Sequence, residues 1–153
     1  MNSKDVSVDD FLGGQVSLKQ PKKGYRITSD SVFLAASIAP KEGDKILDVG
    51  AGSGAILSCL AARLGEDLKS ITLQGVELQD DLISLARENG TDCITYFDGD
   101  ILKDASRVIV RAQKDANGLL TLKSGMIVHK SDGTYSDQAE NILRHACFLD
   151  ITK

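Results

Sequence analysis

The chain has 153 residues, of which 42% are hydrophobic and 26% are charged, and these values are ordinary for a soluble globular protein with one domain. Its formal net charge of −4 provides no global basic field for binding nucleic acid, although a local basic patch is compatible with that balance. No apolar run approaches the ~20 residues of a membrane span, so we expect no transmembrane helix.

The N-terminal part contains a predicted hairpin and then a basic segment. Two adjacent glycines stand between apolar residues within 11–18, which is typical of a hairpin turn. The segment 19–26 carries four cations and one tyrosine. Its favoured interpretation is a solvated loop, and the alternative is an arm whose cations contact phosphates while a base stacks on the tyrosine. The candidate residues for such an arm are Lys22, Lys23, Tyr25 and Arg26.

Helix and strand patterns then alternate along the chain. A helix over 32–39 is expected to follow an N-cap at Thr28 or Ser29 and to stop before Pro40. Strands are expected over 45–49, 71–77 and 93–97, and further helices over 53–64 and 80–89, each closed by a glycine. This order with short links predicts a parallel, doubly wound α/β sheet with right-handed crossovers.

The stretch 45–54, Lys-Ile-Leu-Asp-Val-Gly-Ala-Gly-Ser-Gly, is the most informative motif. An apolar strand enters a glycine-rich turn and a helix follows at once, so the backbone turns sharply and a ligand can approach it. The N-terminus of that helix directs its N–H groups and its positive dipole end into the turn. Gly50, Gly52 and Ala55 also satisfy the G-x-G-x-x-A form of a dinucleotide site.

Asp48, two residues before the first glycine, narrows the choice of ligand. A carboxylate there would repel the pyrophosphate of a nicotinamide dinucleotide. It would attract the sulfonium and ammonium groups of S-adenosylmethionine, which has no phosphate. The sequence therefore favours S-adenosylmethionine over NAD, and the remaining alternative is a tight turn that binds no ligand.

Three acids, Asp48, Glu77 and Asp100, follow or end the predicted strands, where ligands bind in parallel sheets. Glu77 lies about 25 residues after Gly52, near the spacing at which an acid binds ribose hydroxyls. Asp100 is placed to accept a hydrogen bond from an adenine amino group. The alternatives are a surface acid that opens a helix for Glu77, and ordinary turn chemistry for Asp100.

The pattern changes after Asp100. A strand is expected over 107–112, a hairpin over 119–129 and a turn over 131–133. Ser136 caps a predicted last helix, whose apolar face carries Ala139, Ile142, Leu143 and Ala146. We interpret His129 and His145 as ordinary structural or surface histidines.

The three cysteines, Cys59, Cys93 and Cys147, are odd in number and widely spaced. They fit neither a zinc site nor a disulfide framework, so we expect reduced thiols, no metal and a cytoplasmic location. Cys59 and Cys147 fall within helical apolar patterns and are interpreted as buried. The polar residues 1–5 lack the apolar core of a signal peptide.

Residues 10–100 resemble the tRNA (valine) adenine-N6 methyltransferase family, which carries the methyltransferase small domain. The matching stretches are Phe-Leu-Gly-Gly at 11–14, Gln-Pro-Lys-Lys-Gly-Tyr-Arg-Ile-Thr-Ser-Asp-Ser-Val-Phe-Leu-Ala-Ala at 20–36, the glycine turn at 47–54, Gly-Val-Glu at 75–77 and Gly-Asp-Ile at 99–101. Residues 107–149 are similar to the family's C-terminal part.

The resemblance implies an incomplete Rossmann-like class I methyltransferase sheet, with a C-terminal β-hairpin and helix, and S-adenosylmethionine as cofactor. We expect one domain over 1–153, divided into an N-terminal arm and helix over 1–40, a cofactor-binding core over 41–104, and C-terminal strands and a helix over 105–153. The segment around Thr28 and Asp30 is expected to fold over the cofactor. The candidate cofactor-binding residues are Thr28, Asp30, Asp48, Gly50, Ala51, Gly52, Gly54, Glu77, Leu78, Asp100 and Ile101.

The sequence departs from the family in one important motif. The family binds its target base with Asn-Pro-Pro-Tyr. This chain has prolines only at 21 and 40, so it does not contain that motif, and its sequence identifies no catalytic residue. It also lacks the strand that would pair with the first strand, so we expect either 107–112 or a second copy of the chain to cover that edge. We expect a methyltransferase that acts on adenine N6 of tRNA. The alternatives are an impaired remnant that binds the cofactor or RNA, and a nicotinamide-dependent oxidoreductase, which Asp48 disfavours.

Overall fold

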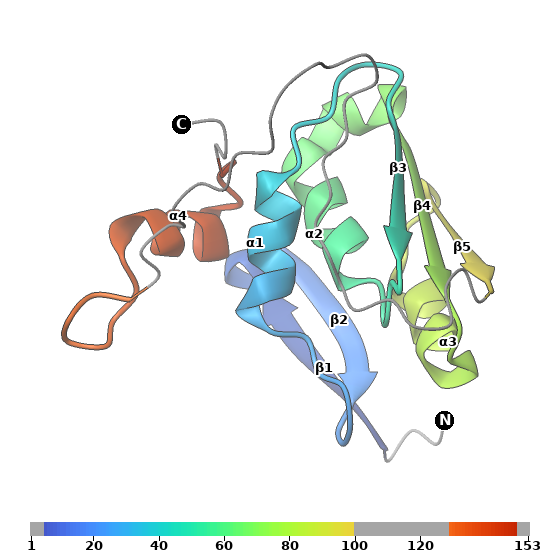
Figure 1. The fold of residues 1–153 in the computed structure, drawn as a ribbon, viewed down its shortest axis with the longest axis horizontal. Helices are drawn as coiled ribbons and strands as arrows, with labels where there is room; N and C mark the ends of the chain where they lie inside the picture. Colours follow the sequence, from blue (N-terminus) through green and yellow to red (C-terminus); the bar gives the residue numbers. More distant parts are fainter. Residues whose placement is uncertain (1–4, 100–128, 150–153) are drawn as a thin grey trace, which may run out of the picture.

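The computed structural model describes residues 5–99 and 129–149 (Figure 1). Their elements, in chain order, are β1 (Val6–Phe11), η2 (Leu12–Gly14), β2 (Val16–Pro21), α1 (Ser29–Ser37), β3 (Lys45–Val49), α2 (Ala55–Leu64), η3 (Gly65–Ser70), β4 (Thr72–Glu77), α3 (Asp80–Asn89), β5 (Ile94–Asp98) and α4 (Asp137–His145). Within this part of the chain, every helix is too short or too polar to cross a membrane.

The predicted N-terminal hairpin is confirmed. β1 and β2 pair antiparallel, with Phe11 opposite Val16 at the turn and Val6 opposite Pro21 at the far end. The turn needs glycine at position 13, because φ is 65° there and a Cβ would lie 2.8 Å from the carbonyl oxygen of Arg144. β2 extends through residues 19–21, so the loop interpretation of that part of the basic segment is wrong. Pairing with β1 makes these residues a strand despite their charge.

The predicted parallel sheet is also confirmed. The strand order is β3-β4-β5, and its register places Asp48 opposite Gly75 and Gly75 opposite Tyr96. α2 connects β3 to β4, and α3 connects β4 to β5. The chain therefore forms the α/β arrangement of a Rossmann-like sheet, in which consecutive parallel strands are neighbours.

The two faces of this sheet differ in burial. On one face Leu73 and Tyr96 are buried in the core that the helices cover. On the other face Leu47, Val49 and Phe97 are 52%, 44% and 45% exposed. Strand alternation explains the difference, because neighbouring residues of one strand point to opposite faces. β3 has β4 as its one hydrogen-bonded neighbour among the described strands, and the predicted strand over 107–112 lies outside the described residues.

α1 and α2 pack together on the helical side of the sheet, with α4 beyond α1 (Figure 1). α1 begins at Ser29, three residues before its predicted start, and ends before Pro40 as expected. α2 begins at Ala55 rather than at residue 53, because Gly54 has a φ of 87° and belongs to the turn. Both helices of the βαβαβ core end at the glycines that the sequence predicted, Gly65 and Gly90.

The C-terminal helix confirms its predicted cap, because the Ser136 hydroxyl accepts a hydrogen bond from the N–H of Ala139 at 3.1 Å. The prediction of a buried Cys147 is wrong. Ala146 adopts a left-handed conformation that ends α4, and Cys147 follows outside the helix with an exposed thiol. The predicted hairpin over 119–129 lies outside the described residues except for His129, which forms an isolated bridge with Tyr135.

Candidate functional site

The glycine turn follows β3 at the carboxyl end of the sheet. The N–H groups of Gly50 and Ala51 both donate to the carbonyl oxygen of Val76 at 2.9 Å, which places the turn over the end of β4. The φ angles of Gly50, Gly52 and Gly54 are 77°, 59° and 87°. Residues with a Cβ rarely adopt such positive φ angles, so the predicted need for glycine at these positions is confirmed.

Glu77, the last residue of β4, connects the turn to the next helix. Its Oε2 accepts a hydrogen bond from the N–H of Gly52 at 2.8 Å. Its Oε1 accepts bonds from the N–H groups of Leu78 and Gln79, both at 2.9 Å, just before α3 begins. Glu77 is 6% exposed, so the alternative of a surface acid is wrong. Its carboxylate fixes the turn and also satisfies N–H groups at the start of α3.

Asp48 and Glu77 lie on the same face of the sheet. Asp48 is opposite Gly75 in the register, and Gly75 and Glu77 are two residues apart on β4, so their side chains share one face. Asp48 is partly buried and close enough to Tyr96 to act on its titration. Burial raises the pKa of the Tyr96 hydroxyl well above its usual value, and the negative charge of Asp48 raises it further. Tyr96 is therefore neutral at physiological pH.

Tyr96 supports the glycine turn from beneath, a role that sequence reasoning missed. A Cβ at Gly75 would lie 2.7 Å from its ring and a Cβ at Gly90 would lie 2.9 Å from it. Its hydroxyl donates to the carbonyl oxygen of Gly54 at 3.4 Å, and a Cβ at Gly54 would collide with that hydroxyl. Glycines in the turn before α2, within β4 and after α3 thus make room for one tyrosine side chain. Glycines inside β4 and after α3 were the available sign of a close approach.

Asn89, at the end of α3, is a second residue that sequence reasoning missed. Its Nδ2 donates to the carbonyl oxygens of Lys19 and Ser53, both at 2.8 Å. Its Oδ1 accepts from the N–H of Lys19, also at 2.8 Å. The side chain therefore links the glycine turn to β2.

Two residues of the basic segment, Tyr25 and Arg26, have different surroundings. The ring of Tyr25 is 39% exposed and would lie 3.5 Å from a Cβ at Gly52. The guanidinium of Arg26 donates to Asp9 at 3.0 Å, to Ser7 at 3.1 Å and to the carbonyl oxygen of Pro21 at 2.8 Å. Arg26 is thus bound within the hairpin, whereas Tyr25 brings the segment to the turn.

The other predicted site residues occupy different places. Leu78 is 58% exposed directly beside Glu77. Lys22 and Lys23 are exposed after the end of β2, and Thr28 and Asp30 are exposed at the start of α1. The roles of these four residues stay predictions, and Asp100 and Ile101 lie outside the described residues.

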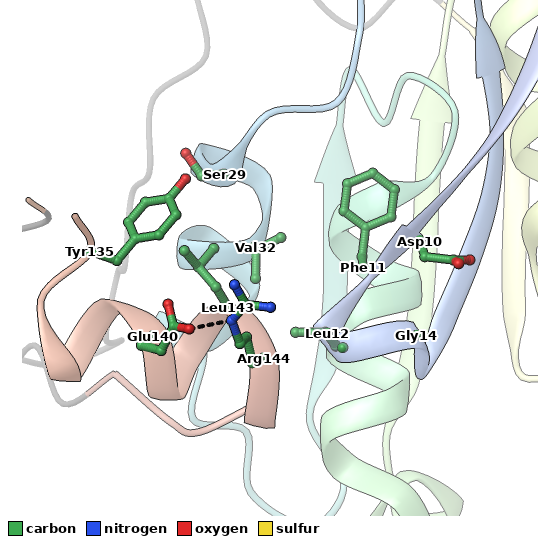
Figure 2. A pocket seen from close by; sticks show the side chains of 11 residues that line it. Asp10, Phe11, Leu12, Gly14, Ser29, Val32, Tyr135, Glu140, Leu143 and Arg144 are labelled. Carbon is green, nitrogen blue, oxygen red and sulfur yellow. Dashed lines mark hydrogen bonds and ion pairs between the residues drawn. The ribbon is translucent and has the colours of Figure 1, made fainter. Parts of the chain in front are cut away.

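A separate hollow of about 580 Å³ lies between η2, α1 and α4. Figure 2 shows Tyr135, Glu140 and Arg144 on one side of it and Phe11 and Leu12 on the other. The glycine turn and Glu77 do not line this hollow. Within 5–99 and 129–149, no three His, Cys, Asp or Glu side chains are grouped so that they could hold a metal ion.

No family model matches the chain. It is similar to ribosomal RNA small subunit methyltransferase A of Geobacter sulfurreducens, with 38% identity over 80 residues. That match covers 50% of this chain and 27% of the relative, so the chain spans about a quarter of the length of the curated relative it matches.

Two solved structures of the plantazolicin methyltransferase BpumL also match about half of the chain. The complex with a triazolic desmethylPZN analog and SAH has a TM-score of 0.37 and 20% identity, covering 50% of this chain and 31% of that one. The complex with SAH has a TM-score of 0.33 and 18% identity, covering 51% and 28%.

Proposed function

We propose that this chain binds S-adenosylmethionine at the glycine turn and serves a methyltransferase that acts on adenine in RNA. The observation that carries the proposal is the 2.8 Å hydrogen bond between the buried carboxylate of Glu77 and the N–H of Gly52. It joins an acid at the end of one strand to the glycine turn that follows the neighbouring strand. The 38% identity with a ribosomal RNA methyltransferase over 80 residues supports the same assignment.

The residues present fit this nucleoside. A carboxylate has about four lone-pair positions, so one of them is left on Oε2 of Glu77 for a ribose hydroxyl. The exposed side chain of Leu78 offers an apolar surface for an adenine ring. Next to Gly50 there is open space, because among the described residues no atom outside Gly50 and its two chain neighbours lies within 4 Å of its Cβ position. Asp48 supplies negative charge for a cationic group and disfavours a pyrophosphate.

S-adenosylmethionine, when bound, supplies an electrophilic methyl group. The contribution of this chain is to orient the nucleoside and hold the acceptor next to it, and such alignment can lower a barrier by about 7–11 kcal/mol. The ring of Tyr25 lies near the glycine turn, and Lys22 and Lys23 precede Tyr25 by three and two residues. We infer that the two lysines contact phosphates of the RNA and that the acceptor is adenine N6 of tRNA.

A second candidate function is binding of the nucleoside or of RNA without methyl transfer. The observation that favours it is the lack of Asn-Pro-Pro-Tyr, since the sequence has prolines only at 21 and 40. Without amide and carbonyl acceptors for the target amino group, alignment of the acceptor loses its specific hydrogen bonds.

Calorimetric titration tests the nucleoside site directly. We expect binding of S-adenosylhomocysteine and no binding of NAD. Glu77→Ala should weaken binding of S-adenosylhomocysteine by ~1–3 kcal/mol, because charged hydrogen bonds are lost. The matched control is Glu42→Ala at an exposed acid in the loop before β3, and this variant should bind as the unchanged protein does. NAD binding, or equal affinity for the Glu77 variant, would remove the proposed site.

Methyl transfer is measured separately. Labelled S-adenosylmethionine is incubated with unmodified tRNA and, in parallel, with small-subunit ribosomal RNA. Incorporation into tRNA adenine supports the proposed acceptor, and incorporation into ribosomal RNA alone replaces it. Binding of the nucleoside with no incorporation into either RNA would establish the second candidate function.

A further inference from the structure

The side-chain amide of Asn89 connects two segments that are far apart in the sequence. It makes a pair of 2.8 Å hydrogen bonds with the peptide N–H and carbonyl groups of Lys19 in β2. The same Nδ2 donates at 2.8 Å to the carbonyl oxygen of Ser53, 36 residues before it in the chain. One side chain therefore holds a point of the hairpin and a point of the glycine turn together.

The carbonyl group of Ser53 is a point at which the conformation of the glycine turn can be fixed. Ser53 stands between Gly52 and Gly54, which both have positive φ angles and wide conformational freedom. Ser53 is 2% exposed, and removal of the Asn89 side chain would take away the hydrogen bond that its carbonyl oxygen accepts. Glu77 accepts a hydrogen bond from the N–H of Gly52, and Asn89 donates one to the carbonyl oxygen of Ser53, the next residue of the turn.

The segment after the hairpin also comes near the turn, because the ring of Tyr25 lies 3.5 Å from the position that a Cβ of Gly52 would take. Tyr25 follows β2, the strand that Asn89 binds at Lys19. Both connections therefore tie one hairpin to one turn. An exposed ion pair between Lys19 and Glu88, at 2.8 Å, also joins α3 to β2, next to Asn89 in the sequence, but neither residue belongs to the glycine turn.

We propose that Asn89 is a positioning residue for the nucleoside site, which sets the glycine turn against the hairpin that precedes Tyr25. This inference rests on the proposed function. Asn89 itself does not contact the nucleoside; it acts through the Ser53 carbonyl and the peptide group of Lys19.

The substitution Asn89→Asp tests the proposal with little change of shape. The variant keeps the acceptor for the Lys19 N–H but turns the donor into a carboxylate oxygen that faces two carbonyl oxygens. We expect about tenfold weaker binding of S-adenosylhomocysteine, equivalent to the loss of one to two hydrogen bonds. We also expect about tenfold faster hydrogen exchange at the amides of Gly52 and Gly54, measured without ligand. Exchange within β4 and β5 should stay unchanged.

Two control variants distinguish the effect of the Asn89 amide from the effect of an added charge and from that of the neighbouring ion pair. Asn141→Asp makes the same substitution at an exposed position of α4, and Glu88→Gln breaks the neighbouring ion pair. Both should keep the affinity and the exchange rates of the unchanged protein. Asn89→Ala serves as a second variant, because it removes the same bonds without adding charge.

The two readouts give distinct outcomes. Unchanged exchange at the turn in both Asn89 variants overturns the proposal. Faster exchange across β4 and β5 together with unchanged affinity also overturns it, because that pattern describes a merely structural side chain. If the unchanged protein does not bind S-adenosylhomocysteine, the proposed function fails. Exchange then decides alone whether Asn89 positions the turn.

Discussion

Replacing Glu77 by glutamine is the most direct test of how the turn is held. The carboxylate accepts three backbone N–H bonds, at 2.8 Å from Gly52 and at 2.9 Å from both Leu78 and Gln79. A glutamine side chain has one oxygen and one NH₂ group, so it cannot serve both sides. If its oxygen faces the start of α3, its NH₂ group faces the N–H of Gly52.

The expected cost follows from burial. Glu77 is 6% exposed, so the N–H group that the glutamine does not bind, for example that of Gly52, is left without an acceptor in a buried position. Leaving a buried donor unsatisfied costs about 1–3 kcal/mol, and a hydrogen bond to a charged group contributes about 1.5–3 kcal/mol. The negative charge near the N-terminus of α3 adds about 0.3–1 kcal/mol. We therefore expect Glu77→Gln to lower the free energy of unfolding by about 2–4 kcal/mol.

Urea unfolding followed by circular dichroism measures this change. The variant should unfold at a lower urea concentration with an unchanged slope, because the surface exposed on unfolding is the same. A surface acid would behave differently, since exposed substitutions usually change stability by less than about 0.5 kcal/mol. A difference below that value would refute the reasoning, because it would mean that Glu77 does not bind the turn in solution.

Further predictions concern the core, the thiols and the hairpin. Gly75→Ala should destabilise the protein by about 1–3 kcal/mol in thermal unfolding, because its Cβ would lie 2.7 Å from the buried ring of Tyr96. Gly99→Ala, whose Cβ would make an ordinary contact at 3.6 Å, is the control and should be nearly neutral. Burial raises the pKa of the Cys59 thiol to about 12, so a disulfide reagent should modify only the two exposed cysteines until the protein unfolds, and rapid modification of all three would contradict the buried position. Hydrogen bonds from Gln20 and then Ser7, together with Arg26, hold the pKa of Asp9 below its ordinary 3.8. Its carboxylate therefore stabilises the hairpin above that pH and the contribution is lost as the pH falls through the lower folded value. Asp9→Asn should make the midpoint of thermal unfolding less dependent on acid, and an unchanged acid profile would contradict the ion pair.

Local patterns were enough to predict the βαβαβ core. The helix over 80–89 was predicted with its observed bounds, because acids open it and Gly90 closes it. The glycine turn was predicted because its residue types allow little else at those backbone angles. Both predictions depend on neighbours within a few residues, which the sequence displays directly.

The remaining errors and omissions come from contacts between distant residues. Arg26 has the residue type of a phosphate ligand, but Asp9, 17 positions earlier, binds its guanidinium. Tyr96 was read only as part of a strand, and Asn89 only as the end of a helix, because their partners lie on other elements. Cys147 was misplaced because an alanine, which rarely adopts a left-handed conformation, ends α4 one residue earlier.

The pairing of Asn89 with Lys19 has a consequence for how copies of the protein meet. β2 has β1 as its one strand neighbour among the described residues, so its other side would offer bare peptide groups to a strand from another molecule. At Lys19 the side-chain amide of Asn89 already forms hydrogen bonds with both the N–H and the carbonyl group, as the backbone of a neighbouring strand would. The end of α3 therefore leaves neither of these Lys19 peptide groups unbonded for an added strand.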